Sequence, residues 1–354
     1  VKNNRNTKIQ MRRLIVTGAG GSAGTNFIKS LRLAPEPFYI VGTDISKYYL
    51  KLSKADVNYQ VNSCYDGIYL NQLNTIIKEE KIEFIHAQPD PEVNVISANR
   101  DKLNAKTFLP NHPILPIAYN KFWLNQELQA HRVPCPKSWM VGDKKHLRQI
   151  FRQNKSKMWV RAVSGAGSLA ALPVTEYKHA SMWIEYWGTR GVEWKDFMIS
   201  EYLPNKEYAF QSLWRNGNLI TSAARERIEY LFQNRMPSGQ SSTPTVAKSV
   251  HNKQVNKIAT EGILALDFMA NGIYCVDLKE NKNGVPCITE INVGRFFTTS
   301  IFFTLAGCNM PYYYILLAYK EKLPSLPKYN AVSEGLYWIR QIDCGEVMVK
   351  ENEL

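Results

Sequence analysis

Three oxygen-bearing side chains in the last third of the sequence have the types and spacing to do chemistry together. Glu290 and Asn292 lie two residues apart in the stretch CITEIN, and Asp277 lies in the stretch YCVDLKE just before it. Side chains alternate across a strand, so residues two apart share a face. The intervening turn NKNG folds one strand back on the other and brings Asp277 within a rung or two of Glu290.

Two carboxylates and one amide oxygen are hard ligands, which suit a magnesium ion that shares its coordination shell with water and substrate phosphates. A surface hairpin with ordinary polar residues is the other interpretation, and the hairpin alone does not decide between the two.

The composition limits the other kinds of site. The six cysteines contain no CxxC pair and the six histidines have no metal-site spacing, so a zinc site is not expected. We expect the cysteines to be free thiols in a reducing cytoplasm. A formal net charge of +13 over 354 residues favours anionic partners such as nucleotides, acidic substrates or nucleic acid. The basic first 13 residues have no apolar core, so we expect a frayed tail and no signal peptide.

No membrane span is expected. The weakly charged stretch 300–319 contains Gly307, Asn309 and Pro311, which divide it into two short helical pieces.

The elements that must position these side chains fall into several groups. The first third alternates strand and helix, beginning with RLIVTGAG (13–20), which predicts a doubly wound α/β domain. A proline-rich bridge (108–120) places a boundary near residue 115. Residues 138–230 read as short strands around one helix, 144–155. A polar loop, a helix and the hairpin of Asp277 follow, and the tail predicts one or two closing strands.

The glycine turn VTGAGGSAG raises a rival function. It follows a strand, opens a helix and is followed by Asp44 at the end of the next strand, which is the context of a dinucleotide fingerprint. An NAD(P)-dependent oxidoreductase must therefore be considered. A short-chain dehydrogenase also needs a Tyr and a Lys one helical turn apart, and here only Tyr202 and Lys206 have that spacing. Pro204 lies between them and disfavours a helix, which weakens this alternative.

Five motifs follow one another in order between residues 121 and 295. They are Lys121 at the start of a helix, KMWVRAVSGAGS (157–168), ISEYLPNKEY (199–208), RERIE (225–229) and EINVGR (290–295). With these motifs the chain resembles, from about residue 12 to about residue 318, the ATP-grasp superfamily, and within it the ligases similar to the large subunit of carbamoyl phosphate synthase. Two departures stand out: the basic residue after Glu-x-Asn, Arg295, is displaced by one, and Leu169 follows GAGS where relatives commonly carry a base.

The resemblance implies a role for each matched residue. Those implied to bind the nucleotide are Lys121, Arg161, Ser164, Gly165, Gly167, Ser168, Glu201, Tyr202, Leu203 and Glu207. Those implied to be catalytic, facing the transferred phosphoryl group, are Arg225, Arg227 and Arg295. The implied magnesium ligands are Asp277, Glu290 and Asn292.

The fold implied is α/β, with an N-terminal doubly wound, Rossmann-like pre-ATP-grasp domain followed by a two-subdomain α+β ATP-grasp fold. The expected boundaries are 11–115 for the Rossmann-like domain, 116–203 for the small subdomain, 204–325 for the C-terminal subdomain and 326–354 for the closing strands. The function implied is an ATP- and Mg²⁺-dependent carboxylate–amine ligase that forms an amide through an acyl phosphate.

The expected partners are a small-molecule carboxylate and an amine, with the acceptor left open as free or linked to a macromolecule or nucleic acid. A cytoplasmic homodimer is expected. The alternatives are the NAD(P)-dependent oxidoreductase and an ATP-binding protein that modifies or binds nucleic acid, although no RNA-recognition motif or zinc finger is present.

Overall fold

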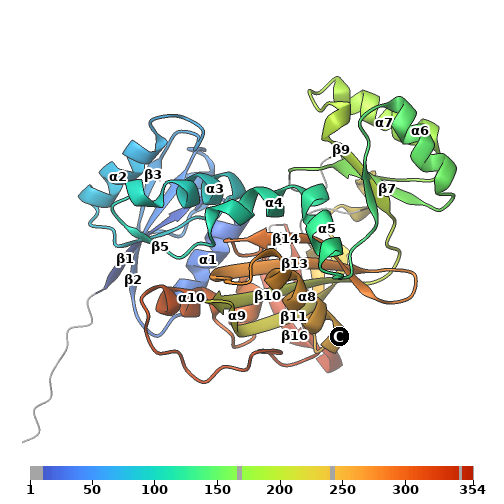
Figure 1. Ribbon diagram of the computed structural model, residues 1–354. Helices are drawn as coiled ribbons and strands as arrows, with labels where there is room; N and C mark the ends of the chain where they lie inside the picture. The colour runs from blue at the N-terminus through green and yellow to red at the C-terminus, as the bar shows by residue number, and fades with distance from the viewer. Residues whose placement is uncertain (1–10, 166–169, 240–243, 343–344, 354) are drawn as a thin grey trace, which may run out of the picture. The chain divides into compact units, whose positions relative to one another are not determined.

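The computed structural model describes residues 11–165, 170–239, 244–342 and 345–353 (Figure 1). The chain divides into two compact units, the first comprising Val1–Leu109, Arg295–Thr304 and Asn309–Lys322, the second comprising Pro110–Gly294, Leu305–Cys308 and Leu323–Leu354. The division at residues 109/110 lies close to the boundary expected near 115. The two segments between 295 and 322 belong to the first unit, whereas the sequence grouped them with the C-terminal subdomain.

The first unit is built on a parallel five-stranded sheet in the order β3-β2-β1-β4-β5. The strands are β1 (Arg12–Thr17), β2 (Phe38–Asp44), β3 (Val57–Gln60), β4 (Phe84–His86) and β5 (Lys106–Thr107). The central strands are nearly continuous buried runs, as expected for strands covered on both faces, while the edge strand β3 alternates between half-buried and exposed residues. The predicted doubly wound domain is confirmed.

Helices cover both faces of this sheet. The chain adds strands first on one side of β1 and then on the other, and right-handed connections in these two directions place their helices on opposite faces. They are α1 (Ser22–Arg32), α2 (Tyr69–Glu79), α3 (Asp90–Ala98) and the late helix α10 (Met310–Ala318), with the short helix α9 (Ile301–Leu305) before it. Helix α10 packs beside α1 and inserts Tyr314 among Phe84, Phe27 and His86 (Figure 1). This aromatic contact explains why the segment belongs to the first unit.

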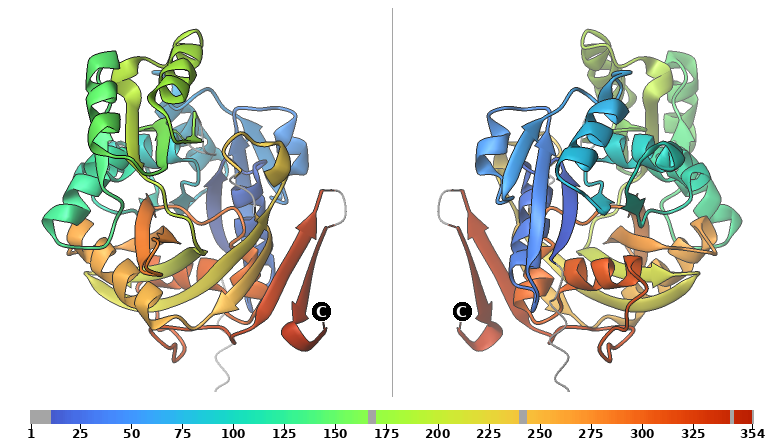
Figure 2. Two further views of the ribbon diagram at one scale, coloured as in Figure 1. Left: turned by 90° about the vertical axis from the view of Figure 1, so that its right-hand side faces the viewer. Right: turned by 90° about the vertical axis from the view of Figure 1, so that its left-hand side faces the viewer.

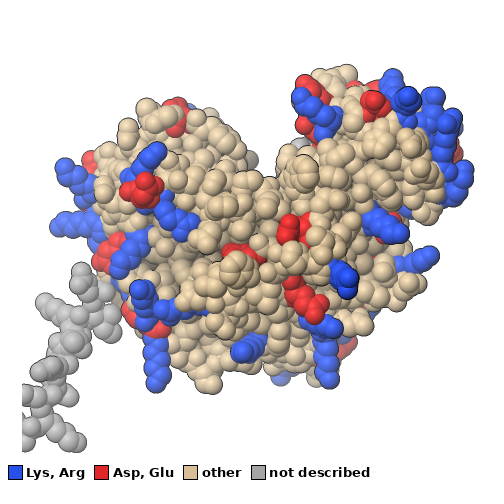
Figure 3. Space-filling model, viewed as in Figure 1, with Lys and Arg blue, Asp and Glu red and all other residues tan. Residues whose placement is uncertain are grey.

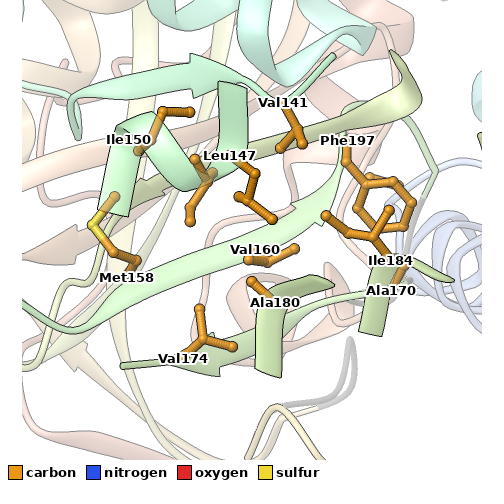
Figure 4. Packing of buried hydrophobic residues seen from close by; sticks show 12 residues of the cluster. Val141, Leu147, Ile150, Met158, Val160, Ala170, Val174, Ala180, Ile184 and Phe197 are labelled. Atoms are coloured by element: carbon orange, nitrogen blue, oxygen red, sulfur yellow. The ribbon is translucent and has the colours of Figure 1, made fainter. Parts of the chain in front are cut away.

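The second unit contains a four-stranded sheet in the order β6-β9-β7-β8. Its elements are β6 (Ser138–Met140), α6 (Lys144–Gln153), β7 (Met158–Ala162), β8 (Leu172–Val174), α7 (Tyr177–Gly188) and β9 (Phe197–Glu201). Leu147 and Ile150 of α6 and Ala180 and Ile184 of α7 pack against Val160 of β7 in one buried cluster (Figure 4). Short helices α4 (Leu115–Tyr119) and α5 (Lys121–Ala130) precede this sheet.

The second unit also contains a seven-stranded antiparallel sheet in the order β14-β13-β10-β11-β12-β15-β16. Its strands are β10 (Glu207–Arg215), β11 (Asn218–Tyr230), β12 (Pro244–Val250), β13 (Gly272–Glu280), β14 (Pro286–Val293), β15 (Leu336–Gln341) and β16 (Gly345–Lys350), and helix α8 (Lys253–Leu266) packs on it. The two closing strands form a hairpin at one end of the sheet (Figure 2). The predicted α+β organisation and the closing strands are confirmed.

Three helices escaped the sequence analysis: α3, α7 and the five-residue α4, which lies in the proline-rich bridge 108–120. The expectation of one helix in residues 138–230 is wrong, because α7 is a second helix of 12 residues. Its Tyr and Trp side chains are weak helix formers, and only a narrow stripe is buried. Helix α3 begins at Asp90 with a proline in its first turn, a position where proline is tolerated.

The weakly charged stretch 300–319 does form two short helices, α9 and α10, as expected. Throughout the described part of the chain, every helix is too short or too polar to cross a membrane.

Candidate functional site

The carboxylates of Asp277 and Glu290 lie directly opposite each other on β13 and β14. Asn292 stands two residues further along the same face and donates its side-chain amide to Asp277, with Nδ2 and Oδ2 3.2 Å apart. A register shift follows, so that Leu278 pairs with Ile288 and Thr289 is left as a bulge. The hairpin therefore brings together the three side chains expected to bind magnesium.

Three bases surround these carboxylates. Arg227 of β11 forms a short ion pair with Asp277. Lys121 Nζ lies 3.8 Å from Oε1 of Glu290, and Arg161 Nη2 lies 3.8 Å from Oε2 of the same side chain. The arrangement balances negative and positive charge at one place on the sheet.

Lys121 is positioned by the start of helix α5. Asn120 caps this helix by accepting from the backbone amides of residues 122 and 123. The backbone amide of Lys121 donates to the carbonyl of Val163, and its Nζ donates to the carbonyl of Gly165 at 2.9 Å. Lys121 is only 4% exposed, so its ammonium group is held between the exit of β7 and Glu290.

Arg161 comes from the middle of the small sheet. Burial lowers the pKa of its guanidinium, while the nearby Glu290 and Asp277 act in the opposite direction. An arginine keeps its charge even so. A desolvated guanidinium facing two carboxylates is suited to bind a phosphate oxygen, because electrostatic attraction is stronger away from water.

Strand register places a third arginine, Arg225, in the row of Asp277. Asp277 pairs with Ala209 of β10, and Ala209 pairs with Arg225 of β11, so Asp277 and Arg225 occupy one row across the sheet. Arg225 is 1% exposed, and its pKa is lowered to about 9 by burial and by the neighbouring guanidinium of Arg227. Burial also lowers the pKa of Arg227, but Asp277 and the other nearby acids outweigh burial and leave it above its ordinary value.

The adjoining row contains Glu207, which the resemblance assigned to the ribose. Both of its carboxylate oxygens accept from protein donors: Lys279 Nζ at 2.5 Å, and the hydroxyl of Tyr230 in a short hydrogen bond. A ribose hydroxyl would have to share these oxygens. The sequence analysis missed Lys279 and Tyr230, although Lys279 lies two residues after Asp277 and therefore on the same face.

The expected adenine-side residues lie at the end of β9. Glu201 accepts from the backbone amide of Lys137 at 3.1 Å, and Leu203 is buried. The ring of Tyr202 lies below Lys157, with Nζ 4.2 Å from the ring centroid, and near Trp159. These neighbours provide an apolar and aromatic lining, which suits a purine ring; the nucleotide role stays a prediction.

Only part of the expected glycine loop can be placed. Ser164 and Gly165 follow β7 and are exposed, and Gly165 has a φ of +94°, a conformation that favours glycine. Gly167, Ser168 and Leu169 lie outside the described residues. Arg295 belongs to the first unit, where it forms a short ion pair with Asp90 at the start of α3.

The glycine turn of the first unit contacts its own chain. A Cβ on Gly20 would lie 2.2 Å from the backbone oxygen of Tyr49, and one on Gly18 would meet Pro89. Asp44, which a dinucleotide fold uses for the ribose, is buried and accepts from the backbone amides of Gly20 and Ser46. The glycines thus permit internal packing, and this observation weighs against the oxidoreductase alternative.

The side chains of the hairpin fit one kind of metal ion better than others. No group of three or more His, Cys, Asp or Glu side chains able to hold a metal occurs within the described ranges. The hairpin instead offers two carboxylates and one amide, a set that fits magnesium sharing its shell with phosphates and water.

Comparison with known proteins supports one family. The model of the ATP-grasp domain matches residues 118–299, more than half of the chain. No curated protein sequence matches. Among solved structures, a biotin carboxylase from Campylobacter jejuni has a TM-score of 0.70 at 13% identity, covering 93% of this chain and 75% of that one.

Two further structures are similar to this chain. An N5-carboxyaminoimidazole synthetase from Staphylococcus aureus in complex with ADP has a TM-score of 0.70 at 14% identity, covering 94% of this chain and 83% of that one. An L-amino acid ligase from Bacillus licheniformis has a TM-score of 0.66 at 13% identity, covering 92% and 78%. These identities show a shared fold, and together with the matched segment they lead to one conclusion: the chain belongs to the ATP-grasp family.

Proposed function

We propose that this protein is an ATP- and Mg²⁺-dependent ligase that joins a carboxylate to an amine. The observation that carries the proposal is the sheet face on which Asp277 and Glu290 stand opposite each other, with Arg227, Lys121 and Arg161 around them. This arrangement lies within the segment that matches the ATP-grasp domain. The ADP complex of the similar synthetase from Staphylococcus aureus supports the same kind of nucleotide.

In this proposal Asp277, Glu290 and Asn292 would hold magnesium. Bound Mg·ATP supplies the phosphoryl group that activates the acid. Lys121 and Arg161 would hold phosphate oxygens, because Lys121 is buried, Arg161 is half-buried and both face Glu290. Ligand binding would thus exchange ion pairs within the protein for ion pairs with phosphates.

The acid to be activated would lie toward Arg225 and Arg227. A carboxylate and a triphosphate repel each other, so guanidinium groups beside them reduce the cost of bringing them together. A carboxylate oxygen of the acid would bond to the γ-phosphorus as ADP departs, which gives an acyl phosphate. The amine nitrogen would then attack the carbonyl carbon, lose a proton and displace inorganic phosphate, leaving an amide.

Several finer features remain proposals. The glycine loop, residues 164–168, would exclude water from the acyl phosphate, as water would hydrolyse it. Arg295 would act on the same phosphoryl group, Glu201, Tyr202 and Leu203 would border adenine, and Glu207 would bind the ribose. We also propose a homodimer located in the cytoplasm, acting on a small-molecule acid and amine.

The reaction is tested by screening carboxylates and amines for ATP-dependent release of ADP. With the correct acid labelled by oxygen-18, one labelled oxygen must appear in inorganic phosphate, and hydroxylamine must yield the hydroxamate of that acid. Arg161→Ala should suppress both signals, while Lys257→Ala, on an exposed face of α8, should suppress neither. ADP release without labelled phosphate and without hydroxamate would refute the acyl phosphate.

The oxidoreductase alternative is tested separately by thermal stability. ATP with magnesium should raise the melting temperature more than NAD(H) or NADP(H), because a ligand that binds only the folded state stabilises it. Stabilisation by a nicotinamide cofactor alone would restore the alternative.

A further inference from the structure

The outer face of helix α6 in the second unit carries a dense group of cations. Residues 144–157 contain six Lys and Arg residues and no Asp or Glu. Leu147 and Ile150 point into the core, whereas the basic side chains are exposed. Figure 3 shows blue side chains gathered on the side of this unit where Figure 1 places α6. The exposed residues Lys145, Arg148, Arg152 and Lys155 are called here the α6 basic face.

Only part of this charge helps the helix itself, because Arg152 lies in the last turn, where positive charge is favourable. After the N-cap Asp143, the first turn of α6 contains no acid and begins with Lys144 and Lys145, although positive charge is unfavourable at a helix N-terminus. Arg148 and Arg152 are four residues apart, a spacing at which like charges destabilise a helix. The ion pair of Lys144 with Glu185, at 2.6 Å, relieves only one of these charges. The basic face is therefore better explained by a ligand than by helix stability.

The other side chains on this face indicate what kind of ligand fits. None of the large hydrophobic side chains that are exposed in the described residues lies between 143 and 157. A protein interface has an apolar centre, and a helix that lies on a membrane has an apolar face. Here the cations are interspersed with the amides Gln149 and Gln153. Polar, strongly positive surfaces of this kind are typical of contacts with nucleic acid.

We propose that the α6 basic face binds the phosphate backbone of a nucleic acid. Arg148 and Arg152 are one turn apart, about 6 Å along the helix axis. Lys145 lies in the first turn of the helix, and Lys155 follows its end at Gln153. The guanidinium of Arg148 lies 4.9 Å over the ring of Tyr177, which restrains it at the surface. None of these residues belongs to the site proposed for ATP, so this inference stands or fails independently of the ligase activity.

The test measures binding of fluorescein-labelled 20-nucleotide single-stranded RNA and of a 20-base-pair DNA duplex by fluorescence anisotropy. Four phosphate contacts predict that the affinity for the single strand falls about 50-fold between 50 and 200 mM NaCl, with a somewhat steeper fall for the duplex. A variant with Lys145→Gln, Arg152→Gln and Lys155→Gln keeps one contact, so its affinity should fall only roughly threefold over the same range. Glutamine is a good helix former, and an unchanged melting temperature checks the fold.

The matched control carries Lys253→Gln, Lys257→Gln and Lys282→Gln, which removes the same net charge from exposed positions elsewhere in this unit. It should bind with nearly the salt dependence of the unmodified chain. A second control changes the basic residues of the N-terminal tail, Lys2, Arg5 and Lys8, to Gln. Equal loss in the control and α6 variants, loss only in the tail variant, or no binding at 50 mM NaCl would overturn the proposal.

Discussion

Replacing Glu290 by Gln removes a negative charge that lies between Lys121 and Arg161. Each base lies 3.8 Å from a different carboxylate oxygen. At an effective dielectric constant of 20, one such pair has a gross attraction of about 4 kcal/mol, most of which desolvation offsets. Glu290 is 23% exposed, which reduces the cost below that of a fully buried pair. We therefore expect Glu290→Gln to lower the free energy of unfolding by about 2 kcal/mol.

A change of this size should lower the melting temperature of the second unit by about 4–8 °C. Tryptophan fluorescence reports on this unit alone, since all eight tryptophans lie between residues 110 and 294 or beyond residue 323. The same variant should lose the part of the ATP-induced stabilisation that depends on Mg²⁺, because a proposed ligand has lost its charge. Turnover should disappear while the protein remains folded.

The matched control is Glu261→Gln on α8. Glu261 pairs with Lys257 at 3.9 Å, but both side chains are exposed, so the melting temperature should change by no more than about 2 °C. If Glu290→Gln behaves like this control, both in stability and in its response to Mg²⁺, then neither the charge balance nor the metal site described above is correct.

Three other outcomes are expected. Lys121→Met should lower turnover with the correct acid about 100-fold or more, since it removes the buried ammonium group that we propose to hold a phosphate oxygen, whereas turnover within tenfold of normal would exclude that role. Tyr230→Phe removes one of the hydrogen-bond donors to Glu207, so the KM for ATP should change while kcat stays nearly constant in the same initial-rate series. An unchanged KM would exclude Glu207 from the proposed nucleotide site. Burial lowers the pKa of His86 to about 4, below its ordinary 6.5, so the folded ring stays neutral while the unfolded chain takes up a proton below pH 6.5. About 3 kcal/mol of stability should therefore be lost as the pH falls from 6.5 toward 4. Hydrogen exchange in β4 measures this loss of stability, which should be smaller in the His86→Phe variant.

Much of the fold follows from the sequence because its signals are local. The buried run of β1, the glycine turn after it and the alternation of strand with helix predict the parallel sheet without tertiary information. The approach of Asp277 to Glu290 also follows, since a short turn fixes how the two strands meet. Helix α7 does not, because its Trp and Tyr side chains are held by packing against the small sheet rather than by helix propensity.

The neighbours of the site depend on long-range register, which the sequence does not contain. Arg225 shares a row with Asp277 only because Ala209 of β10 pairs with both. The engagement of Glu207 by Lys279 and Tyr230 likewise depends on which strands lie side by side. Motif order predicts which residues belong to a site, whereas strand pairing decides which of them already have protein partners.

The bulge at Thr289 limits how this strand can change in length. On one side of the bulge Ile288 is fully buried, and on the other Glu290 lies opposite Asp277. A regular strand of the same length would put Ile288 and Glu290 on the same face, because side chains alternate with a period of two, and the bulge avoids this. Deleting Thr289 would make Ile288 and Glu290 direct neighbours, so that Ile288 could stay in the core and Glu290 opposite Asp277. Deletion of Thr289 should thus be tolerated far better than deletion of Ile291, which would put Glu290 and Asn292 on opposite faces, and a screen of length variants would measure that constraint directly.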